Sequence, residues 1–165
     1  MSNIFLPEHW VNICNKVENI ALEHFFPFIK DKSVRSKLIS NLFETQSAEY
    51  FNSIGIKTKP CTNDKEPDLL FVDTNESCEI KVTSSEKNKS WMGGEYSKRN
   101  SEYILISWVY RESHGSLYGV EPESLRFSVI NTYITQDEWV SCGKNFSGTK
   151  ITEKDLLSKK INILV

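Results

Sequence analysis

The spacing of apolar residues changes near residue 55, and this change limits the possible folds more than any other feature of the chain. Before it, apolar side chains recur at helical spacing from about Pro7 to Phe26 and again from about Ser33 to Ser53. Pro27 and Gly55, which follow these segments, are typical residues at helix ends. After residue 55 the apolar segments are short and alternating, which favours strands. We therefore expect two helices followed by a sheet.

Two of the strand segments form a predicted β-hairpin. Leu69 to Val72 is a compact apolar run, Cys78 to Val82 alternates, and turn-forming residues separate them. Thr152 to Lys160 predicts a short closing helix, with Thr152 as its N-cap. Further strands are predicted at Ile56–Lys59, Glu102–Tyr110, Leu117–Val120 and Phe127–Ile134. The whole chain, residues 1–165, is thus expected to form one mixed α/β (α+β) domain, with a mostly antiparallel sheet flanked by helices.

The composition is typical of a soluble globular domain and excludes several classes of protein. It has no apolar run of about 18 residues and no signal-peptide pattern, so we expect no membrane span and a cytoplasmic location. The cysteines and histidines are scattered, without the spacing of a zinc site, which predicts reduced thiols. A net charge of -2 argues against a protein that coats DNA non-specifically, but it does not exclude a local basic cleft.

Three charged residues of the hairpin are expected to share one face. Glu79 and Lys81 are two apart in a strand, so their side chains project side by side. Asp68 opens the preceding strand. It lies on the same face as Glu79 and Lys81 if the two residue numbers of each directly opposed pair in the hairpin add up to an odd value. A shift of one residue would turn Asp68 to the opposite face. The sequence therefore predicts two carboxylates and one ammonium in a small patch.

This set of groups suits phosphodiester hydrolysis. The attack adds negative charge to an anionic phosphate, and hard divalent cations stabilise that charge and activate water. Mg²⁺ prefers oxygen ligands and keeps several waters, so Asp68 and Glu79 would suffice as protein ligands. Lys81 would hold or deprotonate the attacking water, or stabilise the attacked phosphorus. The simpler alternative is a solvated hairpin with a surface Glu–Lys pair.

Pro67-Asp68, ten further residues and then Glu79-Ile80-Lys81 resemble the signature of the PD-(D/E)xK nucleases. The resemblance covers about residues 38–82. A weaker one extends to about residue 139, because the segment from Tyr118 to Phe127 is similar to the PvuII-like branch of small type II restriction endonucleases. It implies a restriction-endonuclease-like core and sequence-specific, Mg²⁺-dependent hydrolysis of double-stranded DNA by a homodimer, with Mn²⁺ as a substitute. The alternatives are a Holliday-junction resolvase, a repair nickase or an inactive DNA-binding domain on the same fold.

The resemblance also implies an acidic residue on the helix that precedes the hairpin. Glu44 lies eleven residues before Gly55, where the superfamily often carries its glutamate, and we take it as the catalytic candidate. Glu49 lies nearer to the glycine and stays an alternative. The two flank the apolar side of the helix from opposite edges, and either could be a solvated carboxylate.

The segment 83–100 is long for a loop and follows the catalytic strand directly, so we expect it to contact DNA. An ordinary polar surface loop is the alternative. Its candidate DNA-binding residues are Lys87, Lys89, Lys98, Arg99 and Asn100. Weaker candidates are the polar turn around Arg111, His114 and Ser116 and the segment Trp139–Lys150. Residues 1–30 are the predicted dimerisation element, because of their aromatic residues Trp10, Phe25, Phe26 and Phe28.

Overall fold

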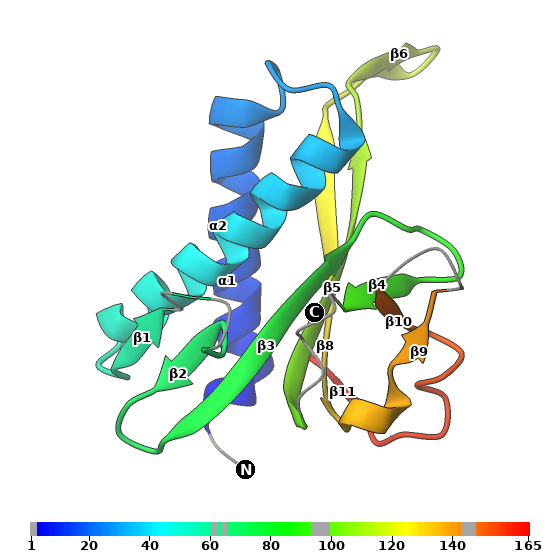
Figure 1. Ribbon diagram of the computed structural model, residues 1–165. Coiled ribbons are helices and arrows are strands. Elements are labelled where there is room, and N and C mark those ends of the chain that lie inside the picture. The colour runs from blue at the N-terminus through cyan, green and yellow to red at the C-terminus, as the bar shows by residue number, and fades with distance from the viewer. Residues whose placement is uncertain (1–2, 61–62, 64–65, 94–99, 143–147) are drawn as a thin grey trace.

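Two long helices precede every strand of the chain (Figure 1). The computed structural model describes residues 3–60, 63, 66–93, 100–142 and 148–165. A short 3-10 turn, Asn3–Phe5, leads into α1 (Pro7–Ile20), and α1 continues as a π-helical turn, Ala21–Phe25. The second helix, α2, spans Lys32–Ser53. The two predicted helices are confirmed, although the last turn of the first is π-helical.

The ends of α2 follow from local chemistry. The Asp31 carboxylate accepts hydrogen bonds from the backbone N–H groups of Ser33 and Val34, both at 2.9 Å, and so caps two of the donors that a helix start leaves unpaired. At the other end, Gly55 has φ +86, a conformation that suits glycine after a helix. The helix therefore stops where the sequence predicts.

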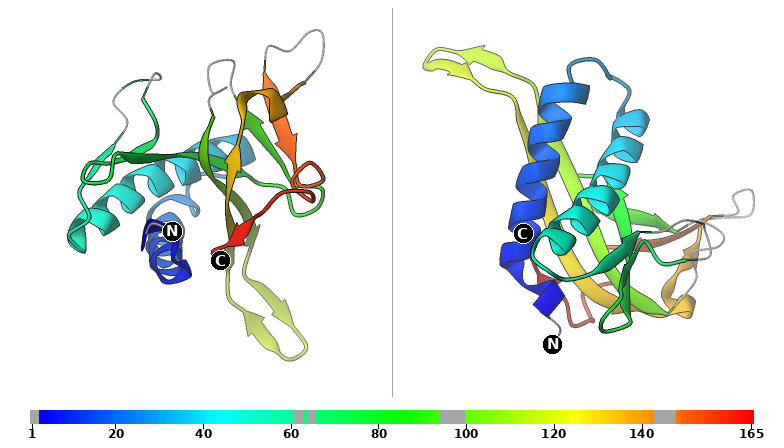
Figure 2. Two further views of the ribbon diagram at one scale, coloured as in Figure 1. Left: turned by 90° about the horizontal axis from the view of Figure 1, so that it is seen from below. Right: turned by 90° about the vertical axis from the view of Figure 1, so that its left-hand side faces the viewer.

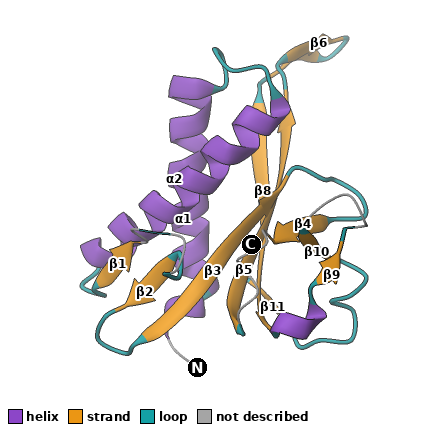
Figure 3. Cartoon of the chain, in the orientation of Figure 1, coloured by secondary structure: helices purple, strands orange, loops and turns teal. Residues whose placement is uncertain are grey.

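A six-stranded sheet forms the centre of the molecule, in the order β1-β2-β3-β5-β8-β11 (Figure 3). All neighbouring pairs are antiparallel except β3 and β5, which run parallel. The expectation of a mixed, mostly antiparallel sheet is confirmed. The strands are β1 (Thr58–Pro60), β2 (Leu69–Phe71), β3 (Glu76–Thr83), β5 (Ser101–Arg111), β8 (Ser124–Ile134) and β11 (Asn162–Ile163).

The helices cover one face of this sheet, and a smaller sheet covers the other (Figure 2). Cys78 and Ile80 of β3 pack in the core beneath the helices. Because side chains alternate along a strand, Glu79 and Lys81 point to the opposite face. On that face a second cluster forms around Trp91 and includes Tyr103, Leu105, Ile134, Trp139, Ile151 and Leu156. The candidate residues thus lie on the side of the sheet that faces away from the helices.

The smaller sheet corrects the prediction of one long loop over residues 83–100. Its strands are β4 (Ser90–Gly93), β10 (Thr149–Thr152) and β9 (Val140–Ser141), in the order β4-β10-β9. The 3-10 turn η3 (Gln136–Glu138) directly precedes β9. Trp91 of β4 is only 2% exposed, and its indole N–H donates to the Ile106 carbonyl at 2.9 Å. Burial of this large side chain stabilises residues 90–93 as a packed strand, whereas the sequence predicted a surface loop.

Two further predictions need correction. Of the strand predicted at Leu117–Val120, Gly119 and Val120 lie in a strand, β7 (Gly119–Glu121). Leu117 and Tyr118 instead form the turn between β6 (His114–Ser116) and β7, which Gly119 allows at φ +128. The chain after Thr152 forms turns instead of a helix, although the Thr152 backbone N–H does donate to the Asp155 carboxylate at 2.7 Å. Leu156 of this segment packs in the second cluster, but Leu157 is 81% exposed, and a short helix with so little apolar contact is marginal in water.

The aromatic residues of the N-terminal segment serve the chain's own core. Trp10 and Phe26 have no exposed surface, and Phe26 stacks edge-on against Trp108. Phe28 is 80% exposed. The aromatic content that suggested a dimer interface at residues 1–30 is therefore largely explained by packing within one chain. No helix in the described part of the chain has the length and apolar character needed to cross a membrane.

Candidate active site

The register of the β2–β3 hairpin places Asp68 on the same face as Glu79 and Lys81. Leu69 pairs with Cys78 and Leu70 with Ser77, so paired numbers have an odd total. Continuing this register by one residue puts Asp68 opposite Glu79. Directly opposed residues of an antiparallel pair project to the same side of a sheet. The predicted register is confirmed.

The three side chains meet. The Lys81 Nζ atom lies 3.7 Å from Asp68 Oδ2 and 3.7 Å from Glu79 Oε2. The side chains of Asp68, Glu79 and Lys81 are 17%, 5% and 18% exposed, respectively. The Lys59–Glu66 pair on the surface is 54% and 34% exposed. Because the cluster is shielded from water, its charges interact more strongly than those of a solvated surface pair.

A backbone hydrogen bond fixes the position of Asp68. Its Oδ2 atom accepts from the backbone N–H of Ile80 at 2.7 Å, between the two other charged residues. The side chain of Ile80 is 2% exposed and belongs to the core under the helices. One residue thus ties the core to the charged cluster, with its side chain on one face and its amide on Asp68.

Glu44 of α2 belongs to the same electrostatic environment. Burial raises the pKa of its carboxyl, and the negative charge of Asp68 raises this pKa further. A hydrogen bond from the Ser40 hydroxyl, at 3.3 Å, and the positive charge of Lys81 act in the opposite direction. Glu49 is exposed and accepts a hydrogen bond from Gln46 at 3.0 Å. Of the two glutamates, only Glu44 is shown to interact with Asp68 and Lys81.

The packing of α2 against β3 accounts for the interaction of a helix residue with this cluster. β2 pairs with residues 76–78 of β3, whereas β3 continues to Thr83. The helix that carries Glu44, α2, packs against β3, the strand that carries Glu79 and Lys81 (Figure 1).

The cluster also acts on a neighbouring thiol. Complete burial raises the pKa of Cys78 well above its ordinary value, and the charges of Asp68 and Glu79 raise it further. Cys78 is therefore a neutral core residue and not a nucleophile. The charges of Asp68 and Glu79, which add to the effect of burial on Cys78, would also attract a cation to the other face of β3.

The donors present suit a hard cation that keeps part of its water shell. Among the described residues, no group of three or more His, Cys, Asp or Glu side chains is arranged to hold a metal ion. Mg²⁺ and Mn²⁺ do not need such a group, because one or two carboxylates with water and substrate oxygens are sufficient. Asp68 and Glu79 fit this requirement, but they do not fit a structural zinc site.

The candidate DNA-binding residues lie in different surroundings. Lys87 is exposed, near Arg111 at the end of β5. Lys89 lines a cavity on the face of the main sheet that lies away from the helices. The Asn100 side chain accepts a hydrogen bond from the Gln136 backbone at 2.7 Å. Lys98 and Arg99 lie outside the described residues.

Two contributors to the site carried no recognisable signal in the sequence. Ser40 donates to Glu44, and the Ile80 amide donates to Asp68. A serine one helical turn before a glutamate and an apolar strand residue are both common patterns. Their roles depend on where α2 and β2 lie in the folded chain.

No protein-family model matches the chain, and no curated protein matches it.

Proposed function

We propose that the chain is a Mg²⁺-dependent DNA endonuclease of the PD-(D/E)xK type, with a restriction-endonuclease-like core. The observation that carries this proposal is the shielded cluster in which Lys81 lies 3.7 Å from both Asp68 and Glu79. A hairpin with an ordinary surface pair would not need to place a lysine between two carboxylates at low exposure. The order of a helix acid, Asp68 and Glu79-Ile80-Lys81 supports the same class.

Each residue of the cluster has a task that its position supports. Asp68 and Glu79 would hold the metal ion, which when bound supplies charge neutralisation at the phosphate and a more acidic water. The Ile80 amide keeps Asp68 oriented before substrate arrives. Lys81 brings a positive charge to the place where negative charge develops, and the two carboxylates keep that charge in position. Glu44 adds an acidic group whose raised pKa makes it easier to protonate than an ordinary glutamate.

Within this class we propose a type II restriction endonuclease that acts as a homodimer in the cytoplasm on a short, two-fold symmetric DNA sequence. The similarity of residues 118–127 to the PvuII-like branch supports this choice. In the structure, Leu125 and Phe127 of this segment begin β8 and pack in or against the core. A junction resolvase or a nickase would use the same cluster, so the substrate has to distinguish them.

The test is cleavage of a long linear duplex with Mg²⁺, comparing the parent with Asp68→Ala, Glu79→Ala and Lys81→Ala. We expect discrete fragments from the parent and a loss of rate by orders of magnitude in each variant, since residues that act as a unit fail together. Glu49→Ala, on an exposed helix position, is the control and should cut like the parent. Equal rates for the parent and the Lys81 and Asp68 variants would show that the site is misassigned.

A second measurement separates the members of the class. A restriction enzyme should give a fixed set of fragments and leave a four-way junction of unrelated sequence intact. Cutting of the junction in preference to linear duplex would favour a resolvase, and single-strand nicks would favour a nickase. DNA binding without any cleavage would favour an inactive domain.

A further inference from the structure

A β-hairpin projects from the body of the protein at the ends of β5 and β8. It consists of β6 and β7, which pair only with each other, and every residue of both strands is exposed (Figure 2). At its tip, Leu117 and Tyr118 are both 100% exposed, and Val120 is 75% exposed. We call residues 112–123 the arm. A two-stranded ribbon of this kind is only marginally stable in water by itself. The base of the arm contacts the body through Glu112 and Glu123, whereas its tip packs against no described residue.

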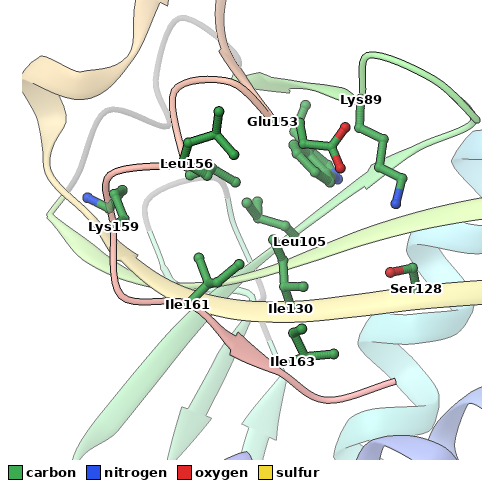
Figure 4. A pocket seen from close by; sticks show the side chains of 11 residues that line it. Lys89, Leu105, Ser128, Ile130, Glu153, Leu156, Lys159, Ile161 and Ile163 are labelled. Carbon is green, nitrogen blue, oxygen red and sulfur yellow. The ribbon is translucent and has the colours of Figure 1, made fainter.

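An apolar cavity of about 340 Å³ lies on the face of the main sheet that carries Leu105 and Ile130 (Figure 4). The turns after β10 form its other wall, through Leu156, Leu157 and Ile161. In Figure 4, Lys89, Glu153 and Ser128 lie toward one side of the cavity, and the aliphatic residues Leu156, Ile130 and Ile161 line the rest.

The rim of this cavity continues as exposed apolar surface. Leu157 is 81% exposed, Ile163 is 67% exposed and Ile161 is 41% exposed. Together with the arm, this is a second place where large aliphatic side chains face water next to one another. Grouped exposure of this kind marks a binding surface more often than isolated exposed residues do.

A chain cannot bring these two surfaces together by itself. The arm extends beyond the ends of β5 and β8 where residues 111 and 124 pair, whereas β11 and the cavity lie toward the middle of β8, at residues 128–131. Figure 1 and both views of Figure 2 show the arm directed away from the body and from β11. Any contact between the arm tip and the cavity therefore joins two molecules.

The charges of the two surfaces are complementary. The arm contains Glu112, Glu121 and Glu123 but no lysine or arginine. Within the chain, Glu112 lies 4.0 Å from Lys30, Glu121 lies 3.3 Å from His114, and Glu123 accepts a hydrogen bond from the Tyr110 hydroxyl at 2.9 Å. The first two pairs are exposed to water, where such contacts are weak, so the arm remains an acidic surface. The cavity is lined by Lys89 and Lys159 against one acidic residue, Glu153. Lys159 pairs with Glu138, whereas Lys89 forms no ion pair with a described residue. A basic group is thus available at the cavity for an acidic partner.

We propose that the arm tip of one molecule docks in this cavity of a second copy, and that the second copy returns the same contact about a two-fold axis. Leu117 and Tyr118 fill the apolar part, and a glutamate of the arm lies near Lys89. The exchange is reciprocal, so the assembly closes as a dimer and leaves neither surface exposed. This proposal concerns assembly and does not depend on the nuclease activity.

The first experiment measures the dimer dissociation constant by sedimentation equilibrium for the parent and three variants. Leu117→Ser/Tyr118→Ser alters the arm tip, and Leu157→Lys alters the cavity rim. Both changes are at exposed positions, so the fold should persist, and circular dichroism checks this. Each should weaken the dimer by at least about tenfold, as expected for central apolar contacts. Phe28→Ser, at an exposed aromatic residue of the N-terminal segment, is the matched control and should leave the dimer unchanged.

The second experiment tests whether the tip and the cavity meet each other. The arm variant keeps an intact cavity, and the cavity variant keeps an intact arm. A mixture of the two should form a mixed dimer with one intact contact, detected by native mass spectrometry with a mass tag on one chain. Failure of the mixture to dimerise would show that the two surfaces do not pair.

Other results would also overturn the proposal. A parent chain that stays monomeric at high concentration excludes the exchange, and a ladder of larger oligomers excludes its closed form. Dissociation by Phe28→Ser but not by the arm variant would place the interface on the N-terminal helices. An arm variant that stays dimeric but loses affinity for DNA would make the arm a DNA contact instead.

Discussion

The Asp68 carboxylate accepts a 2.7 Å hydrogen bond from the backbone N–H of Ile80, across the hairpin formed by β2 and β3. This bond places the carboxylate between the positions of Glu79 and Lys81. Asp68 therefore has two roles, as a negative charge and as the hydrogen-bond acceptor of the Ile80 amide. Two different substitutions can test these roles separately.

Asp68→Asn and Asp68→Ala should therefore differ in stability but not in activity. The asparagine side chain can still accept from Ile80, whereas alanine leaves a partly buried amide without its acceptor, a loss of about 1–3 kcal/mol. Both variants remove the charge and should cut DNA slower by orders of magnitude. Urea unfolding together with single-turnover cleavage measures the two effects. A fully active Asp68→Asn variant would contradict a role for this charge.

Glu44 should make the stability of the protein depend on pH. Its pKa is raised in the folded chain, so the folded state binds this proton more tightly than the unfolded state. Stability is therefore lost as the pH rises from the ordinary value of 4.5 through the raised folded pKa. The side chain in Glu44→Gln is neutral at every pH. The free energy of unfolding of this variant, measured in urea, should therefore rise relative to that of the parent as the pH increases through this window.

Glu49→Gln is the matched control for that measurement, because Glu49 is an exposed glutamate on the same helix. It should follow the parent curve. A Glu44→Gln variant whose stability relative to the parent is the same on both sides of the window would argue against burial of Glu44 beside Asp68.

Cleavage should require Mg²⁺ or Mn²⁺ and stop when a chelator is added. Ca²⁺ should support DNA binding without turnover, because it is larger and less strict in its coordination geometry. Cleavage and filter binding in parallel with each ion would check this. Undiminished cutting in excess EDTA would refute the proposed use of Asp68 and Glu79.

The buried position of Trp91 predicts a large effect on stability. Trp91→Ala should cost about 3–5 kcal/mol, because it removes a core side chain and leaves a cavity. Met92 is the next residue of β4 and is 47% exposed, so Met92→Ala should change stability by less than about 1 kcal/mol. Chemical denaturation of both variants decides whether β4 is a packed strand. Equal, small effects would favour a loop that is free to contact DNA.

Lys87 and Asn100 should respond differently, although both are candidate DNA contacts. Lys87 is exposed, so Lys87→Ala should weaken DNA binding if Lys87 touches a phosphate. The salt slope, by which we mean the slope of log binding constant against log salt concentration, should then fall in magnitude by about one. Asn100 holds the Gln136 backbone at 2.7 Å, so Asn100→Ala should lower the melting temperature with little effect on the salt slope. Titrations at several salt concentrations distinguish the two. An unchanged slope for Lys87→Ala would remove it from the DNA surface.

Much of the candidate site followed from local sequence. The placement of Glu79 and Lys81 on one face needs only the two-residue period of a strand, and the turn residues between Phe71 and Glu76 favour a hairpin. The ends of α2 follow from Asp31 and Gly55, whose effects act within one turn of the helix. These features depend on neighbours a few residues away, and such neighbours are visible in a sequence.

Other features were decided by contacts between distant parts of the chain. Glu44 and Glu49 lie on the same helix with similar surroundings in sequence, but only the packing of α2 beside β3 gives Glu44 its interaction with Asp68 and Lys81. Trp91 is buried because β10, some sixty residues later, pairs with β4 and closes the second layer. Burial, and with it the pKa and accessibility of a side chain, depends on everything packed around it, so local patterns alone could not assign these residues.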